Sequence, residues 1–273
     1  MGNNSSTYEE EGSRQQAQPV LHPQPEKILA QNQPRQTSYA SNASDNYHRT
    51  SSSNNNNYNN KTAMEEAKKE AIKLPHNFEA VIKDSDSPIN RSSPEKLVEQ
   101  FRAGIFLNDR KMKYWVNRDN INCFLVFAKG LQITWGEDLR YWVFQNIATR
   151  EEGQITVAVL RNVCWLEAHG RFQTTNLTPD VKYEVAYFIM LEDSSCGWQV
   201  PVNFRLTLPN GSKQEHKENL NRRPREEWIR IPAGEFETSM ENQGEIEFSL
   251  YEHEGGNWKK GLVIKGVAIE PKM

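Results

Sequence analysis

From about residue 114 onward, apolar residues recur at every second position, and this alternation constrains the fold of the chain more than any other feature. Such alternation is typical of β-strands that bury one face. Turns rich in Gly, Pro and Asn separate the segments. The predicted strands are Asn122 to Ala128, Leu131 to Trp135, Ile155 to Leu160, Val163 to Gln173, Lys182 to Leu191, Pro201 to Leu208, Glu227 to Ile231, Glu245 to Glu252 and Leu262 to Glu270. Short strands without intervening helices predict an all-β fold, an antiparallel β-sandwich or jelly roll.

The N-terminal part has a different composition. Residues 1–61 are rich in Asn, Ser, Gln and Pro, which cannot bury enough apolar surface to offset their conformational entropy, so we predict a disordered tail. The first residues, with Gly2 and Ser6, fit the N-myristoylation pattern. One acyl chain at Gly2 would give only weak membrane association.

Residues 62–106 are predicted to form a helical linker region. A first helix is expected over 63–73, where Glu and Lys recur at helical spacing. A second is expected over 94–103, because Ser93 can cap it and its apolar residues share one face. We expect this second helix to dock on the β domain, assigned to residues 107–273.

Length and composition bound the class of protein. The chain has 273 residues and a net charge of -3, and no apolar stretch is long enough to span a membrane. We therefore expect a protein of the cytoplasm or nucleus.

The chain has three cysteines, Cys123, Cys164 and Cys196. Their spacing is not that of a metal site, so we expect reduced structural thiols. An intermolecular disulfide bridge stays open as an alternative.

Signs of catalysis are weak. No nucleophile elbow, phosphate-binding loop or paired-histidine motif occurs, so we expect no enzyme activity, no metal and no cofactor. Glu245 and Glu247 could resemble the pair of catalytic carboxylates of a glycosidase. However, alternate residues of a strand lie on the same face, and two glutamates there usually only face the solvent. The basic run 221–225 could serve nuclear import or nucleic-acid binding. Two glutamates follow it at once, which favours a solvated loop.

Two tryptophans stand out, Trp135 and Trp142. The break at Gly136 places them on either side of a turn. An indole face flanked by carboxylates and amides suits a sugar ring, whose C–H groups pack on the aromatic face while its hydroxyls hydrogen-bond nearby. The alternative is that both are core tryptophans of the β domain.

A series of motifs in the same order resembles the plant phloem lectins (phloem protein two) and the related Nictaba-type agglutinins, from about Leu107 to the C-terminus. The motifs are residues 122–135, Tyr141-Trp142, 163–167, 170–172, 183–187, 234–236 and 258–271. With the helix and residues 113–116 ahead of them, the order is most similar to the long-tailed phloem lectins.

The resemblance implies a β-sandwich lectin domain that binds N-acetylglucosamine oligomers and N-glycan cores without a metal. The tryptophans of that site align with Trp135 and Trp142, and its first glutamate aligns with Glu235. At the position of the second glutamate this chain has Asn242, whose amide can donate and accept hydrogen bonds but cannot make the charge-assisted kind. Trp165 and Trp258 also recur in the family, and we assign both to the core.

These observations lead to the hypothesis of a non-catalytic, cytoplasmic lectin of the phloem that captures N-acetylglucosamine-containing glycans or glycoproteins. The alternative is a structural or interaction protein with a weakened sugar site, bound to phloem filament protein or RNA. Whether the chain forms a homodimer stays open.

Overall fold

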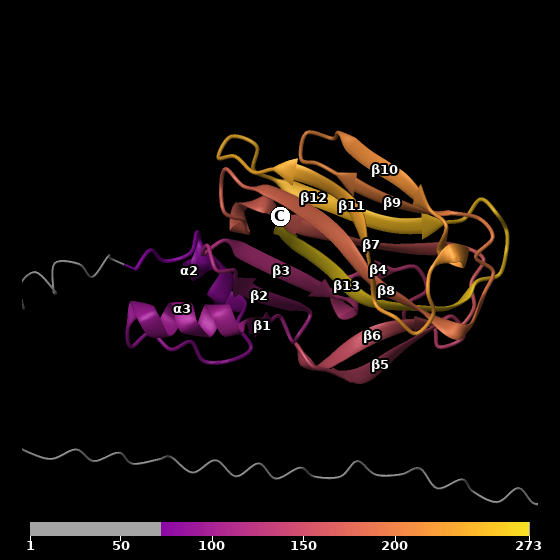
Figure 1. Cartoon of the computed structure of the whole chain (residues 1–273), viewed down its shortest axis with the longest axis horizontal. Coiled ribbons are helices and arrows are strands. Elements are labelled where there is room, and N and C mark those ends of the chain that lie inside the picture. Colours follow the sequence, from indigo (N-terminus) through magenta and orange to yellow (C-terminus); the bar gives the residue numbers. More distant parts are fainter. Residues whose placement is uncertain (1–71, 273) are drawn as a thin grey trace, which may run out of the picture. The chain divides into compact units, whose positions relative to one another are not determined.

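The computed structural model describes residues 72–272, which form two antiparallel β-sheets with short helices at one end (Figure 1). The prediction of an all-β, sandwich-like domain is confirmed. The predicted tail, Gly2 and nearly all of the helix expected over 63–73 lie outside the described residues. None of the helices within 72–272 is long and apolar enough to cross a membrane.

The first sheet has eight strands and the second has five. The eight-stranded sheet consists of β1 (Ile105–Leu107), β2 (Met112–Val116), β3 (Asn122–Phe127), β5 (Trp142–Thr149), β6 (Gly153–Leu160), β8 (Lys182–Cys196), β11 (Ile229–Glu237) and β13 (Lys260–Pro271). The five-stranded sheet has the order β10-β9-β12-β7-β4, with β4 (Gln132–Ile133), β7 (Leu166–Gln173), β9 (Val202–Thr207), β10 (Lys213–Glu218) and β12 (Glu245–Glu252). The short helices are α2 (Phe78–Val81), α3 (Pro94–Ala103) and the 3-10 turns η1 (Ile82–Asp84), η2 (Ala128–Gly130), η3 (Thr174–Asn176) and η4 (Leu220–Arg222).

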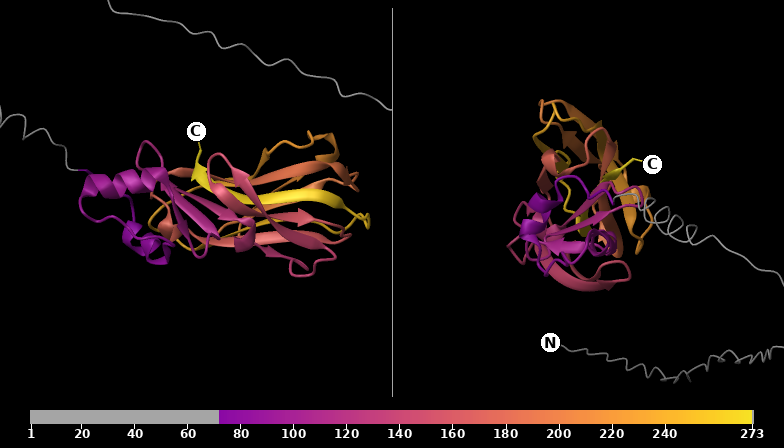
Figure 2. Two further views of the ribbon diagram at one scale, coloured as in Figure 1. Left: turned by 90° about the horizontal axis from the view of Figure 1, so that it is seen from below. Right: turned by 90° about the vertical axis from the view of Figure 1, so that its left-hand side faces the viewer.

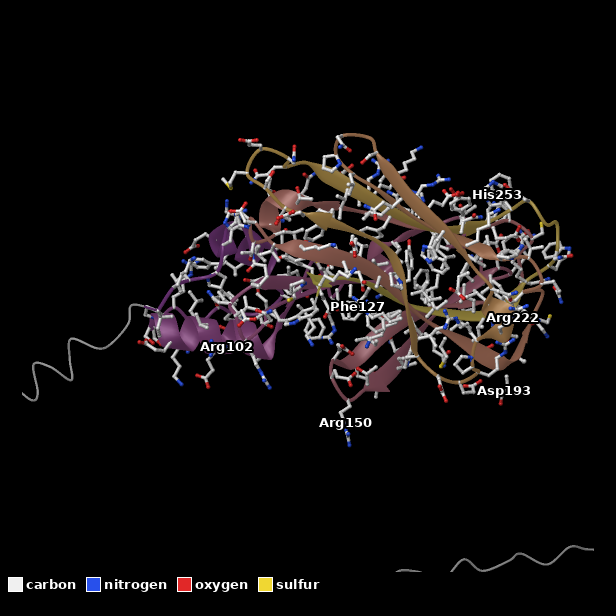
Figure 3. The ribbon with its side chains drawn as sticks, turned by 45° about the horizontal axis from the view of Figure 1, so that its top comes forward. Arg102, Phe127, Arg150, Asp193, Arg222 and His253 are labelled. Carbon is white, nitrogen blue, oxygen red and sulfur yellow. The ribbon has the colours of Figure 1, made fainter. Side chains whose placement is uncertain are left out.

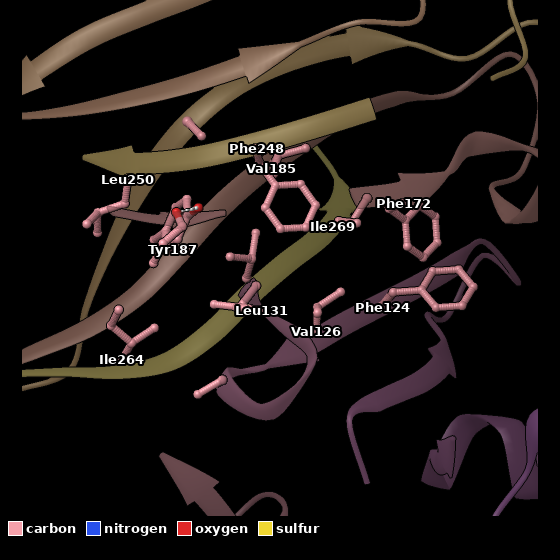
Figure 4. Packing of buried hydrophobic residues seen from close by; sticks show 14 of the residues in the cluster. Phe124, Val126, Leu131, Phe172, Val185, Tyr187, Phe248, Leu250, Ile264 and Ile269 are labelled. Carbon is pink, nitrogen blue, oxygen red and sulfur yellow. Dashed lines mark hydrogen bonds between the residues drawn. The ribbon is translucent and has the colours of Figure 1, made fainter. Parts of the chain in front are cut away.

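The main core lies between the facing sides of the two sheets. Tyr187 of β8 meets Phe204 of β9 and Phe248 of β12 edge to face, at ring-centroid distances of 5.6 and 6.3 Å. Figure 4 shows Tyr187 and Val185 of β8 among the side chains of β12 and β13. Burial alternates along β7 and β12, so each of these strands has one apolar face in the core and one polar face outside.

Helix α3 forms where the sequence predicts it. Ser93 Oγ accepts the backbone N–H of Lys96 (3.3 Å), Pro94 stands at the first turn, and Gly104 ends the helix at a positive φ of 87°. The ring of Phe101 meets Tyr114 of β2 edge to face at 5.4 Å. The helix therefore docks on the β domain, as expected, and Figure 2 shows α2 and α3 together at one end of the strands.

Four strands of the structure were not among those predicted: β1, β2, β5 and β10. Several predicted strands differ in extent: β4 covers only Gln132–Ile133 and β7 begins at Leu166, while β8 continues to Cys196 and β11 to Glu237. The shortness of β4 matters for the site, because the chain leaves the sheet edge there and enters the turn that carries Trp135.

Candidate functional site

Trp135 occupies a turn just beyond edge strand β4. The N–H of Gly136 bonds to the carbonyl of Ile133 (2.8 Å) and closes the turn, and Trp135 has a φ of 59°. A left-handed backbone is rare for a bulky residue and costs about 1–2 kcal/mol. Even so, the indole is 48% exposed, so little burial offsets this strain. Strained backbone clusters at functional sites, which makes Trp135 a candidate binding residue.

A hollow of about 620 Å³ lies beside this turn. Its wall is formed by residues 131–138 and by His169 of β7. The His169 ring nitrogen Nε2 lies 2.7 Å from Gln132 Oε1, which fixes an imidazole and an amide at the sheet edge. Glu137 adds an exposed carboxylate that makes no ion pair within the described residues. The hollow therefore combines one aromatic face with several hydrogen-bonding groups.

Residues 138–141 support the Trp135 side chain. The Tyr141 ring lies 5.4 Å from the indole, with an angle of 39° between the planes. The guanidinium of Arg140 lies 5.3 Å from the Tyr141 centroid and pairs with Asp138 (2.6 Å). Hydrogen bonds from Arg140 hold the pKa of Asp138 below its usual range. Asp138 Oδ1 also accepts the backbone N–H of Arg140 (3.0 Å), so this carboxylate braces the segment that follows Trp135.

Trp142 requires a correction. It was predicted to share the sugar site, but it is only 1% exposed and belongs to the main core, at the start of β5 opposite Leu160. An indole enclosed in this way has no free face for a ligand. The alternative drawn from the sequence, a core tryptophan, therefore describes Trp142, while Trp135 is at the surface.

Glu235 and Asn242 lie together in a different hollow, of about 470 Å³. Glu235 forms ion pairs with Lys182 and Lys272, whose hydrogen bonds lower its pKa. Its backbone N–H is accepted by Gln214 Oε1 of β10 (2.9 Å). Asn242 is exposed, in the turn between β11 and β12. The Glu235 carboxylate is paired within the molecule, and a ligand hydroxyl that bound it would share it with two lysines.

The two hollows lie at opposite edges of the five-stranded sheet. Trp135 follows β4 at one edge, whereas Glu235 contacts β10 at the other. Four strand spacings of about 4.8 Å separate those edges, on the order of 20 Å. The predicted site residues therefore do not converge: Trp135 stands in one place, Glu235 and Asn242 in another, and Trp142 in the core.

Trp165 and Trp258 were assigned to the core, and this was wrong: they are 42% and 55% exposed. Trp165 precedes β7, and its indole Nε1 donates to Glu167 Oε2 (3.1 Å). Thr134 Oγ1 donates to the same oxygen (3.1 Å), so Trp165 adjoins the turn that carries Trp135. The alternation Trp165-Leu166-Glu167 is the sequence signal that could have placed this indole on the outer face.

Other groups considered from the sequence have intramolecular partners. Arg171 pairs with both Glu245 (3.6 Å) and Glu247 (3.1 Å), so those carboxylates belong to a cross-strand ion network. In the basic run, Arg223 pairs with Glu218 (3.0 Å). Within the part of the chain that the structure describes, no cluster of three or more His, Cys, Asp or Glu could hold a metal ion.

The fold and this surface define an all-β binding domain that presents an indole on an edge turn. The sequence from residue 121 to 271 matches the family described as Phloem protein 2, and the chain belongs to that family. It is similar to Protein PHLOEM PROTEIN 2-LIKE A1 of Arabidopsis thaliana, with 48% identity over 75% of this chain and 84% of the relative. It is also similar to proteins named Lectin from Luffa acutangula (42% identity; 74% of this chain, 96% of the relative) and Coccinia grandis (34%; 54% and 93%).

Proposed function

We propose that this chain is a non-catalytic lectin that binds N-acetylglucosamine-containing glycans in the hollow beside Trp135. The observation that carries the proposal is the Trp135 indole, which is exposed in spite of a strained backbone and is surrounded by carboxylate, amide and imidazole groups. The relatives named Lectin support carbohydrate binding as the general activity and a non-catalytic protein.

The chemistry of the hollow fits an N-acetylated sugar. The C–H face of a pyranose ring packs on the exposed indole, which removes apolar surface of both partners from water. The sugar hydroxyls and the acetamido N–H are donors for the carboxylate of Glu137. The acetamido carbonyl is an acceptor for the amide of Gln132, whose Oε1 is engaged by His169. Such a site uses stacking for affinity and hydrogen bonds for orientation.

Titration calorimetry of the full chain tests this function. Chitotriose should bind, whereas cellotriose, which has hydroxyl groups in place of the acetamido groups, should bind at least tenfold more weakly, a loss of about 1.4 kcal/mol. Equal binding of both would reject the preference for N-acetylated sugars, and no binding of either by a folded protein would reject the function at this site.

We further propose that the protein acts in the cytoplasm of phloem cells.

A second function, assembly through intermolecular disulfide bonds, is favoured by one observation: Cys196 is exposed and unpaired. Two observations distinguish assembly from the lectin function. On non-reducing electrophoresis, a ladder of disulfide-linked oligomers that Cys196→Ser abolishes supports assembly. A protein that sugar elutes as a monomer or dimer supports the lectin.

A further inference from the structure

The indole of Trp165 is held in place by two direct contacts. His253, shown at the end of the domain opposite Arg102 of α3 in Figure 3, stacks on the indole at 4.3 Å with only 13° between the planes. Tyr251 of β12 in turn stacks on His253 at 5.5 Å and 23°. The carboxylate of Glu167 accepts the indole N–H. Because both its orientation and its rotamer are fixed, little side-chain entropy would be lost when a ligand packs on the remaining open surface.

The groups behind this stack are fixed as well. The hydroxyl of Tyr251 donates to Glu215 of β10 (2.7 Å), and the guanidinium of Arg205 lies 4.6 Å from the Tyr251 ring centroid. The side chains of Trp165, His253, Tyr251 and Arg205 thus form one stack. It extends from the start of β7 across β12 to β9, on the outer, polar face of the five-stranded sheet. An indole that served only to cover the sheet would be expected to lie flat on it and become buried, but Trp165 is 42% exposed.

Glu167 connects this indole to the Trp135 turn. One oxygen, Oε2, accepts hydrogen bonds from both Thr134 and Trp165, each at 3.1 Å, and Thr134 N–H also bonds to the Glu167 carbonyl (3.0 Å). Trp135 is the next residue after Thr134. Trp165 therefore lies across the β4–β7 pairing from Thr134, the residue before Trp135, and the Glu167 carboxylate links the two segments.

We propose that Trp165 is a second sugar-stacking position next to the Trp135 hollow, so that the ligand is an oligosaccharide whose successive rings contact both indoles. This inference rests on the proposed function. The consequence is that affinity depends on chain length, which a site for a single terminal sugar would not show.

Calorimetry with N-acetylglucosamine, chitobiose and chitotriose on the full chain tests the proposal. For the wild type, affinity should rise with length, by about tenfold or more between the shortest and longest ligand, the gain expected of one additional stacked ring. Trp165→Ala should bind N-acetylglucosamine as the wild type does and lose the gain with length. Trp165→Phe should keep part of the gain, and Trp228→Ala, which removes an exposed indole before β11, should keep all of it.

The outcomes separate the two proposals. If affinity does not depend on length, or if Trp165→Ala keeps the full gain, the second position is rejected while the lectin function stands. If Trp165→Ala weakens all three ligands equally, Trp165 belongs to the first site and the proposal is also rejected. If the folded wild type binds none of the three, the lectin function itself fails, and this inference fails with it.

Discussion

Trp135 and Trp142 are only seven positions apart in the chain, yet the first is 48% exposed and the second 1%. The turn closed by Gly136 and the Asp138–Arg140 pair separates them: Trp135 stays at the sheet edge, and Trp142, the first residue of β5, enters the core. Substitutions at the two positions should therefore affect different properties of the protein.

Trp135→Gly should not destabilise the fold. Glycine adopts a positive φ without the steric cost that Trp135 bears, and the indole contributes little burial. We expect the free energy of unfolding, measured by urea denaturation, to stay unchanged or rise by up to about 1 kcal/mol. A loss of more than about 1 kcal/mol, typical of a residue that holds structure, would contradict this.

Trp142→Ala should instead destabilise the fold by about 3–5 kcal/mol, because it removes a fully buried indole from the main core. Trp142→Phe, which leaves a smaller cavity, should cost less. Urea denaturation with the same protocol measures both. A Trp142→Ala protein as stable as the wild type would place this indole outside the core.

The loop that carries His253 depends on a buried ion pair. Lys259 and Glu252 are 0% and 1% exposed and pair with each other. Lys259 Nζ also donates to the carbonyl of Cys164 (2.7 Å), beside Trp165, and Glu252 accepts the N–H of Gly255 (2.7 Å). Lys259→Met would leave a buried carboxylate without its partner, so we expect a loss of about 3–5 kcal/mol in unfolding free energy.

The control for this pair is the double variant Lys259→Met with Glu252→Gln, which leaves no uncompensated charge. It should recover most of the lost stability in the same denaturation experiment. If the single and double variants were equally unstable, the loss would come from packing and not from the unpaired charge.

The same pair makes stability dependent on pH. Burial alone would raise the pKa of Glu252, but Lys259 and the nearby backbone N–H groups outweigh it, and the pKa lies below its usual value. A carboxyl group whose pKa is lower in the folded protein stabilises the fold at pH values above its pKa in the unfolded chain, about 4.3 for glutamate. This contribution disappears as the pH falls through the pKa of the folded protein. Thermal melts between pH 7 and 3 should show a smaller decrease in melting temperature on acidification for the double variant than for the wild type. Equal decreases would contradict this role of the ion pair.

The cysteines should differ in reactivity. Burial, and secondarily the charge of Glu270, raises the pKa of Cys123 to about 12, whereas Cys196 is exposed. A thiol reagent at pH 8 should therefore label Cys196 rapidly and Cys123 only after unfolding. Cys196→Ser should remove the fast phase, and a fast phase that remained unchanged in this variant would contradict the assignment.

Alternation was enough to predict the strands that bury one face, such as β7 and β12, because the core imposes a period of two on them. It could not reveal β10, an edge strand of the sequence Lys213-Gln-Glu-His-Lys-Glu218 that has no apolar face. It also missed β5, most of whose side chains are exposed or half-buried.

Sequence was less informative about the site, for a physical reason. Whether an indole is buried depends on long-range packing, so the pattern around Trp135 and Trp142 could not separate them. The position of Trp165 beside the Trp135 turn depends on the pairing of β4 with β7, a non-local contact. The positive φ of Trp135, the strongest indication of a special role, is visible only in the structure.

Titration of the full chain with chitotriose, comparing wild type, Trp135→Gly and the control Trp228→Ala, tests the central claim most directly. Loss of one stacking contact, about 1–3 kcal/mol, should weaken binding by Trp135→Gly by about 5- to 150-fold. Trp228→Ala should bind as the wild type does, and urea denaturation should confirm that all three proteins are folded. Unchanged affinity in a folded Trp135→Gly protein would show that the sugar binds elsewhere on the domain.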